Sequence, residues 1–332
     1  MPAVSRIVTI ARFFAGSLAR VVRAAVITNA TSARNRRRVE RIERALGRNV
    51  DHRVCDSIED LPKVVDDLLR ARVELLGVNG GDGTIHSVLT DLAQKCEGDF
   101  PTLALLPGGS TNMTARDINA GPLSLRAALA SFVAAIERPP KTVSRCAIRA
   151  RDGSRPPQIG FLFGMGAVIR GIEYCHERIF ALGIRKELAS GIAMARAAWG
   201  IARREPVFAQ GVALDARFDG EAHRGRASIF LVTALDALFL GIKPFWGPGE
   251  GPLAVTWVAD DARRFLRTFP ALLRGEADRL HECEGYLSRR AHRVEVRGDD
   301  RYTIDGEIYR AQGDLVLDDY RPLSFVPLGA AR

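Results

Sequence analysis

Two glycine-rich segments carry the residues whose types and spacing point to chemistry. The first, Gly-Gly-Asp-Gly-Thr at residues 80–84, follows an apolar run at 73–78 and precedes Ile85, from which apolar residues recur at helical spacing. Glycines let backbone N–H groups approach an anion without obstruction by a Cβ, and the N-terminus of a following helix adds partial positive charge. The segment therefore favours a ligand that carries phosphate.

Asp82 is the unexpected residue of this segment. A carboxylate inside an anion-binding turn repels phosphate, unless it binds Mg²⁺ or accepts a proton from a nucleophile. In the alternative interpretation, the turn is simply tight and Asp82 caps the N-terminus of the helix that follows. The segment is neither a Walker loop, which ends in Gly-Lys-Ser/Thr, nor a Gly-x-Gly-x-x-Gly motif. Alone, it leaves both roles open.

The second segment, Pro-Gly-Gly-Ser-Thr-Asn at residues 107–112, repeats the arrangement after the apolar run at 102–106. A single glycine-rich turn between a strand and a helix is common. Two such turns in succession, the second with hydroxyl groups and Asn112 beside it, favour a nucleotide whose phosphate chain bridges both.

Strands and helices alternate in the first part of the chain, which is typical of a parallel α/β sheet. The predicted strands span residues 24–28, 73–78 and 102–106, and the predicted helices span 33–46, 85–92 and 125–136. Ligands bind such sheets in the crevice at the carboxyl ends of the strands. The polar turns that follow the three strands should therefore meet at one edge of the sheet.

The pattern changes after residue 140. A helical stretch at about 171–204 is followed by short apolar runs bounded by turns, some of which alternate with polar residues as antiparallel strands with one solvated face do. We therefore expect an α/β nucleotide-binding domain at 1–140 and a β-rich domain for a lipid substrate at 141–312, with 313–332 returning to the first domain.

The motifs resemble one family when they are taken together. Val-Asn-Gly-Gly-Asp-Gly-Thr at 78–84 and Leu-Pro-Gly-Gly-Ser-Thr-Asn at 106–112 resemble the diacylglycerol kinase catalytic domain superfamily, which includes sphingosine kinases and bacterial lipid kinases. Residues 29–33 are similar to its Asn-Pro-x-Ser-Gly turn, and residues 304–307 to its late Asp-Gly-Glu motif. The Gly-Gly-Asp-Gly element is shared with NAD kinases and phosphofructokinases, but its companions favour the lipid kinases.

The resemblance implies an α/β domain with a parallel sheet, like that of NAD kinase and phosphofructokinase, and a β-sandwich second domain. In the cleft between them, ATP with Mg²⁺ would donate its γ-phosphoryl group to the hydroxyl of a lipid such as diacylglycerol or a sphingoid base. Carried over by position, the nucleotide-binding residues are Asn29, Thr31, Ser32, Gly80, Gly81, Gly83, Thr84, Gly108, Gly109, Ser110 and Asn112.

The same resemblance implies that Asp305, Asp82 and Glu307 are catalytic. Either aspartate is a candidate for the base that accepts the proton of the lipid hydroxyl, and Glu307 is a metal ligand or an electrostatic partner. As metal ligands we expect Asp82 and Glu307. A structural alternative places Asp305 in a hairpin turn between two strands. The sequence departs from the family's pattern at residues 30 and 33, which are alanines, and at His86 and Met113.

The charge distribution points to a membrane surface and not to nucleic acid. Residues 1–50 contain 11 arginines and only two glutamates, whereas the rest of the chain has equal numbers of basic and acidic residues. Residues 5–23 have the spacing of a basic amphipathic helix, which either lies on anionic lipid or packs on the protein. Five scattered cysteines indicate a reducing compartment. We therefore expect a cytoplasmic, peripherally membrane-associated protein, and a homodimer is left open.

Two other functions are compatible with the motifs. One is a soluble kinase similar to NAD kinase, and the other is a lipid or nucleotide sensor without catalytic activity on the same fold. The apolar segment 239–246 is likewise open to two interpretations, since it either faces lipid or packs in the core.

Overall fold

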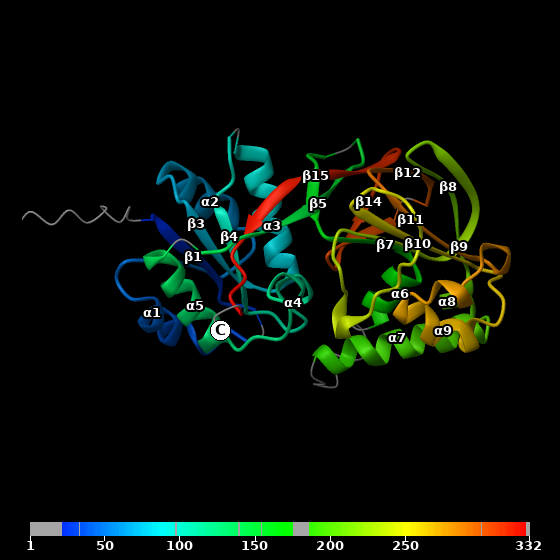
Figure 1. Ribbon diagram of the computed structural model, residues 1–332, viewed down its shortest axis with the longest axis horizontal. Coiled ribbons are helices and arrows are strands. Elements are labelled where there is room, and N and C mark those ends of the chain that lie inside the picture. The colour runs from blue at the N-terminus through cyan, green and yellow to red at the C-terminus, as the bar shows by residue number, and fades with distance from the viewer. Residues whose placement is uncertain are drawn as a thin grey trace, which may run out of the picture.

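The computed structural model describes residues 22–32, 34–96, 98–138, 140–153, 155–174, 186–299 and 301–329. The proposed amphipathic helix at 5–23 lies almost entirely outside these residues. Two lobes lie side by side, an α/β domain that contains the N-terminal elements and a second domain rich in antiparallel strands (Figure 1). This architecture confirms the predicted fold class. Among the described helices, none has the length and apolar character to span a membrane.

The first domain is built on parallel strands whose central members are short and apolar. They lie in the order β4-β3-β1-β2, so β1, β3 and β4, which precede the polar turns, are neighbours. Their residues are nearly all buried, which is why they appear in the sequence as continuous apolar runs. The strands are β1 (Ala24–Asn29), β2 (Asp51–Cys55), β3 (Leu75–Gly80) and β4 (Thr102–Pro107).

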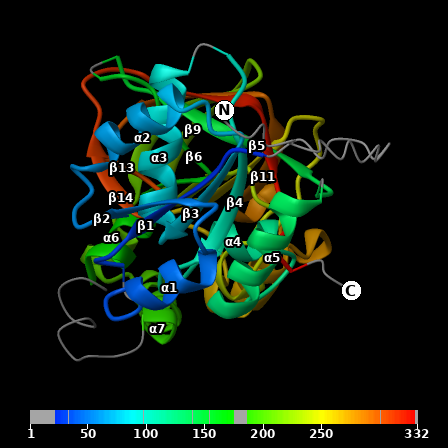
Figure 2. The ribbon, with the colours of Figure 1, turned by 90° about the vertical axis from the view of Figure 1, so that its left-hand side faces the viewer.

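Helices cover both faces of this sheet, as Figure 2 shows. On one face, α1 and α5 bury Ile42 and Phe132 against Val26 of β1. On the other face, α2 and α3 bury Val65 and Val88 in the cluster that holds β1 and β3. The helices are α1 (Val39–Leu46), α2 (Leu61–Arg70), α3 (Asp82–Lys95), α4 (Met113–Ile118) and α5 (Leu125–Glu137).

The structure adds elements that the sequence pattern did not indicate. Strand β2 has a polar sequence because it pairs only with β1 at the edge of the sheet, and helix α2 follows it. The predicted helix at 33–46 begins only at Val39, since the preceding residues form turns around a fully buried side chain, Asn35. That start of the predicted helix was wrong.

The second domain consists of mostly antiparallel strands with helices α6 to α9 gathered along one side (Figure 1). Its core contains Phe163, Phe230 and Trp257, each almost completely buried. The strands are β5 (Val143–Arg151), β6 (Gln158–Gly160), β7 (Leu162–Gly166), β8 (Val212–Phe218), β9 (Glu221–Thr233), β10 (Leu253–Ala259), β11 (Tyr286–Ala291), β12 (Arg293–Gly298), β13 (Arg301–Ile304) and β14 (Glu307–Arg310). The helices are α6 (Ala167–Tyr174), α7 (Lys186–Ala202), α8 (Pro206–Ala209) and α9 (Phe265–Arg274).

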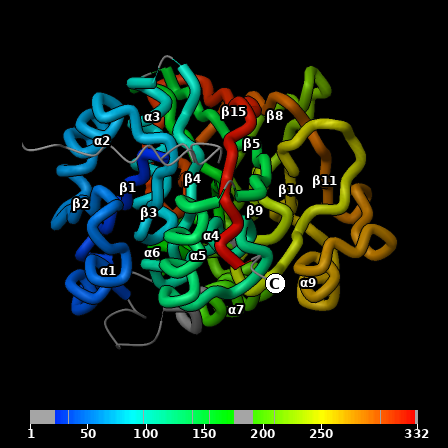
Figure 3. Tube along the Cα trace, turned by 60° about the vertical axis from the view of Figure 1, so that its left-hand side comes forward, coloured from blue at the N-terminus to red at the C-terminus, as the bar shows by residue number. Residues whose placement is uncertain are grey.

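Strand β15 (Leu315–Phe325) joins the two domains. It pairs with β12 and β5 in the second domain, and its last residue pairs with Leu103 of β4. Figure 3 shows this strand crossing from one lobe to the other beside β5. The chain thus returns to the first domain close to its C-terminus, and the sheets of both domains are continuous.

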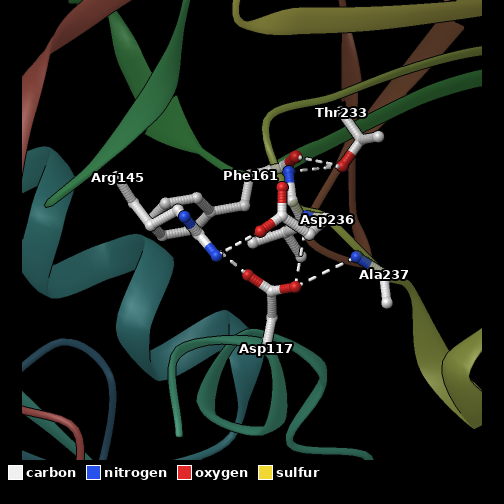
Figure 4. A network of polar contacts seen from close by, with 7 residues as sticks. Asp117, Arg145, Phe161, Thr233, Asp236 and Ala237 are labelled. Carbon is white, nitrogen blue, oxygen red and sulfur yellow. Dashed lines mark hydrogen bonds and ion pairs between the residues drawn. The ribbon is translucent and has the colours of Figure 1, made fainter. Parts of the chain in front are cut away.

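A polar network beside this junction ties α4 to the second domain (Figure 4). One carboxylate oxygen of Asp117 accepts hydrogen bonds from the backbone N–H groups of Asp236 and Ala237, at 3.1 and 3.0 Å. The other accepts from Arg145 Nε at 3.2 Å, and Arg145 also pairs with the exposed carboxylate of Asp236. Only 4% of the Asp117 side chain is exposed, so water cannot easily replace this carboxylate as the acceptor for its hydrogen-bond donors.

We expect Asp117→Ala to lower the free energy of unfolding by about 1–3 kcal/mol, because the buried carboxylate and its bonds to two backbone N–H groups and to Arg145 are lost. Asp236→Ala removes an exposed carboxylate of the same network and should cost no more than about 1 kcal/mol. Urea-induced unfolding followed by circular dichroism measures both. Equal losses in the two variants would contradict the assignment of Asp117 as the buried centre of the network.

Candidate active site

Three loops meet at the carboxyl ends of β1, β3 and β4, where the sequence placed the candidate nucleotide-binding residues. The two glycine turns touch each other directly. A Cβ on Gly109 would lie 2.3 Å from the Cα of Gly81, and a Cβ on Gly108 would lie 2.5 Å from Oδ1 of Asn79. These approaches are too close for any side chain, so glycine is required at both positions.

Asn29 organises the first loop. Its side-chain amide donates to Thr84 Oγ1 at 2.9 Å, and its Oδ1 accepts from both the backbone N–H and the hydroxyl of Thr31, at 2.9 and 2.7 Å. The buried Asn35 side chain donates to the carbonyl oxygens of Asn29 and Asn79, both at 3.0 Å. The polar residues of the first two loops are therefore fixed before any ligand binds.

Asn112 shapes the second glycine turn. Its side chain accepts from the N–H of Gly109 and donates to the carbonyl of the same residue, both at 2.8 Å. Its backbone lies in the left-handed region, with φ of 49°. Asn112 is almost completely buried, whereas Ser110 and Thr111 beside it are partly exposed. Ser32 of the first loop is also partly exposed.

Asp82 does not cap its own helix. The N-cap of α3 is Gly81, and no side chain caps this helix, so its first-turn amides lack the usual side-chain acceptor. The Asp82 carboxylate instead accepts hydrogen bonds from the backbone N–H groups of Met113 at 3.1 Å and Thr114 at 2.9 Å, at the start of α4. The capping interpretation was wrong about which helix is capped.

Asp305 enters the site from the second domain. It lies with Gly306 in the two-residue turn between β13 and β14, and both residues have positive φ, 48° and 95°. Its Oδ1 accepts from the N–H groups of Phe161 at 3.1 Å and Leu162 at 2.9 Å. The hairpin interpretation is therefore correct as geometry, while the carboxyl group is buried and close enough to Asp82 of the first domain for the charge of Asp82 to affect it.

The two aspartates influence each other. Burial and the charge of Asp82 raise the pKa of Asp305 to about 8, although the N–H groups of Leu162 and Phe161 oppose this. Burial likewise raises the pKa of Asp82, against the hydrogen bonds at the start of α4. Near neutral pH the pair therefore holds a proton that it can exchange with a bound hydroxyl group.

Glu307 follows the turn and lies over the first glycine segment. A Cβ on Gly83 would lie 2.8 Å from Oε1 of Glu307. The carboxylate is exposed and forms no hydrogen bond or ion pair with any other described residue. Asp82 is therefore near both Asp305 and Glu307, which lie more than 200 residues later in the sequence.

His86 was not assigned a role from the sequence, yet it connects the two domains inside the site. Its Nδ1 lies 2.7 Å from the carbonyl oxygen of Ile159 on β6, and its Nε2 lies 2.6 Å from the hydroxyl of Tyr309 on β14. Because a carbonyl only accepts, Nδ1 carries the proton and Nε2 accepts from Tyr309. Burial lowers the pKa of His86, which favours this neutral form.

A cavity of about 340 Å³ begins at the aspartate pair and extends into the second domain. Asp82, Thr111, Asp305 and Gly306 lie at its polar end. The rest is almost entirely apolar, and its lining includes Met113, Val168, Ala197, Leu238 and Phe269. Part of the 239–246 segment, including Phe239 and Ile242, lines the same cavity.

Residues 23–144 match the model of the diacylglycerol kinase catalytic domain. The match spans most of the N-terminal domain and less than half of the chain. A probable lipid kinase, YegS of Salmonella arizonae, is 39% identical over 89 residues, which cover 26% of this chain and 30% of that protein. The chain thus aligns with less than a third of the length of this relative.

The solved structures extend the similarity of fold beyond this domain. A putative diacylglycerol kinase from Bacillus anthracis superposes with a TM-score of 0.66 over 92% of this chain and 96% of its own, at 15% sequence identity. A second structure described in the same way gives a TM-score of 0.64 at 16% identity. At this identity the likeness establishes the shared two-domain fold.

The aspartate pair makes the free energy of unfolding depend on pH. Since the pKa of Asp305 is higher in the folded than in the unfolded protein, the folded state binds more protons and loses stability as pH rises from about 4 to about 8. In Asp305→Asn the Oδ1 acceptor remains, but the charge does not. We expect the free energy of unfolding of the variant relative to wild type to increase by at least about 1 kcal/mol between pH 5 and pH 8. A pH-independent difference would contradict the raised pKa.

Tyr309→Phe tests the connection between the domains through His86. The variant leaves the buried Nε2 of His86 without a donor, so we expect the free energy of unfolding to fall by about 1–2 kcal/mol. Tyr320→Phe is the matched control, because the Tyr320 hydroxyl forms no hydrogen bond with any other described residue. It should change the free energy by less than about 0.5 kcal/mol. Equal values would show that the His86 contact contributes nothing.

Proposed function

We propose that the protein is an ATP-dependent lipid kinase that transfers the γ-phosphoryl group to a hydroxyl of a lipid such as diacylglycerol or a sphingoid base. One observation carries the proposal. A single cavity has two acidic side chains at one end and apolar walls elsewhere, so an acyl chain could fill it while its hydroxyl-bearing head reaches Asp82 and Asp305. The match of residues 23–144 to the diacylglycerol kinase catalytic domain supports the same reaction.

The glycine turns supply the phosphate site of this proposal. The first-turn amides of α3 have no side-chain cap, and a helix N-terminus favours negative charge. Gly83 and Thr84 belong to this turn, and Asn29 holds the Thr84 hydroxyl in place. The start of α4 is already occupied by Asp82, so the phosphates would contact the second turn through residues 108–111 and not through the helix.

The acidic residues then act on the lipid hydroxyl. The carboxylate form of Asp305 or Asp82 accepts the hydroxyl proton as the oxygen attacks the γ-phosphorus, and the bond to the β-phosphate oxygen breaks. A pKa near 8 suits this role, since the ionised fraction is still appreciable at neutral pH and the carboxylate is basic. Asp305 is held by two backbone N–H groups, which fix its direction toward the cavity.

The carboxylates also fit a magnesium ion. No cluster of three or more acidic, histidine or cysteine side chains is found among the described residues, but Mg²⁺ commonly binds through one or two carboxylates together with substrate phosphates. Glu307 has no other partner in the described part of the chain, and each oxygen of Asp82 retains a lone pair beyond its N–H contact. The ion would neutralise negative charge on the transferred phosphoryl group.

The cavity argues against the two other functions. A soluble dinucleotide would leave its polar groups without partners against these apolar walls. A sensor without catalytic activity does not need carboxyl groups with raised pKa values at the end of its lipid pocket.

Transfer of labelled phosphate from ATP to dispersed diacylglycerol and sphingoid bases tests the proposal. We expect Asp305→Asn to lower kcat by about 10²–10⁴-fold, because the base is lost, while nucleotide binding stays within twofold. The matched control is Asp261→Asn, which removes an exposed aspartate outside the cavity and should leave kcat unchanged. No lipid product with wild-type protein, or full activity in Asp305→Asn, would reject the assigned chemistry.

A further inference from the structure

Helix α7 has apolar residues on two opposite faces. Its inner face, with Ala193, Ala197 and Ile201, lines the cavity. Its outer face carries Ile192 and Trp199, whose exposed fractions are 45% and 48%. A helix on the surface of a protein in water normally has charged or polar residues on its outer face. The outer face of α7 therefore departs from the pattern of a helix that faces only water.

The apolar surface extends beyond α7 to its neighbours. Leu240, which is 55% exposed, lies beside the first turns of the helix, since a Cβ on Gly191 would be 3.6 Å from its Cδ1. At the other end, Leu266 of α9 is 48% exposed and shares a shallow groove with Arg204. We call the surface formed by Ile192, Trp199, Leu240 and Leu266 the α7 face. Figure 1 shows α7 and α9 along one edge of the second domain.

Arginines surround the α7 face. Five exposed side chains lie at the C-terminal end of α7 and around the start of α9, namely Arg203, Arg204, Arg263, Arg264 and Arg267. The Arg203 guanidinium lies over the Trp199 ring at 4.8 Å from its centre. None of the five forms an ion pair with another described side chain. Of the two aspartates in the same groove, Asp260 is paired with Arg226, and Asp261 is exposed without an ion pair to a described residue, so the five arginines outnumber it. The free charge of this surface is therefore positive.

Tryptophan with aliphatic residues and unpaired arginines is the combination that binds the headgroup layer of an anionic membrane. We propose that the α7 face docks on an anionic bilayer and places α7 between the membrane and the cavity. An acidic protein partner would need only the arginines, and a second copy of the chain would need only the apolar residues. Docking at this face would bring the bilayer, as the source of the lipid substrate, next to the cavity on the inner side of the same helix. This link to the cavity rests on the proposed lipid kinase function.

Sedimentation with vesicles tests the proposal on the full chain. The vesicles contain phosphatidylcholine alone or with phosphatidylglycerol. We expect Ile192→Gln/Trp199→Gln to weaken binding to the anionic vesicles at least tenfold. Val54→Gln/Ile58→Gln is the matched control, since these residues are 41% and 44% exposed on the first domain, and it should bind as wild type does. Unchanged binding of the α7 double variant would overturn the proposal.

The arginines are tested separately. Arg203→Gln and Arg267→Gln should each weaken binding to the anionic vesicles about fivefold and leave binding to phosphatidylcholine unchanged. The difference should diminish between 0.05 M and 0.5 M salt, because exposed charges are screened. An equal effect on both kinds of vesicle would contradict the electrostatic part of the proposal.

Two further measurements distinguish membrane docking by the α7 face from binding through the N-terminal segment and from a dimer contact. Deletion of residues 1–21 should leave a substantial part of the vesicle binding; complete loss on deletion, with no effect of the α7 variant, would assign the contact to the N-terminal segment and overturn the proposal. A change of the α7 variant in self-association, measured by light scattering, without a change in vesicle binding would assign the face to a second copy.

Kinase assays keep the two proposals distinct. With lipid dispersed in detergent, the α7 double variant should turn over as wild type does, since neither residue lines the cavity, and it should be slower only on vesicles. Wild-type protein that binds vesicles through the α7 face but transfers no phosphate would reject the kinase function and keep the docking surface. Activity in detergent without any vesicle binding would reject the docking surface and keep the kinase function.

Discussion

The site depends on one interaction, the contact of the Asp82 carboxylate with the first backbone N–H groups of α4. It joins the turn after β3 to the turn after β4, which already touch through Gly81 and Gly109. It also fills the N-terminus of α4, so the amides left for an anion are those of α3. A carboxylate that looks out of place in a phosphate-binding turn is thus part of what holds the two turns together.

The second constraint is the placement of the two domains against each other. Helix α3 begins with Asp82, and one turn later His86 bonds to Ile159 and Tyr309 of the second domain. Ile159 lies two residues before Phe161, whose N–H group holds the Asp305 carboxylate. Tyr309 lies on β14, the strand that follows the turn containing Asp305. The distance between the two aspartates is therefore set by contacts within the interface, and their mutual effect on pKa follows from that distance.

Helix α7 of the second domain separates the cavity from the α7 face. The inner side of α7 encloses apolar space that ends at the acidic pair, and its outer side presents tryptophan and arginine to the surroundings. A surface helix usually has a polar outer side, and α7 departs from this pattern. The membrane contact that we propose would account for its apolar outer side.

The sequence by itself determined the parallel sheet and the glycine turns at 80–84 and 107–112, because buried strands and glycine turns leave local patterns. Residues 304–307 were singled out only through the resemblance to the lipid kinases. It did not show the edge strand β2, whose polar residues have no periodic signal, or the buried Asn35 inside an arginine-rich stretch. Only the tertiary structure decided which helix Asp82 caps, that His86 bridges the domains, and that α7 lines a cavity with one apolar face and exposes another. These features depend on contacts between segments far apart in the chain, which no local pattern encodes.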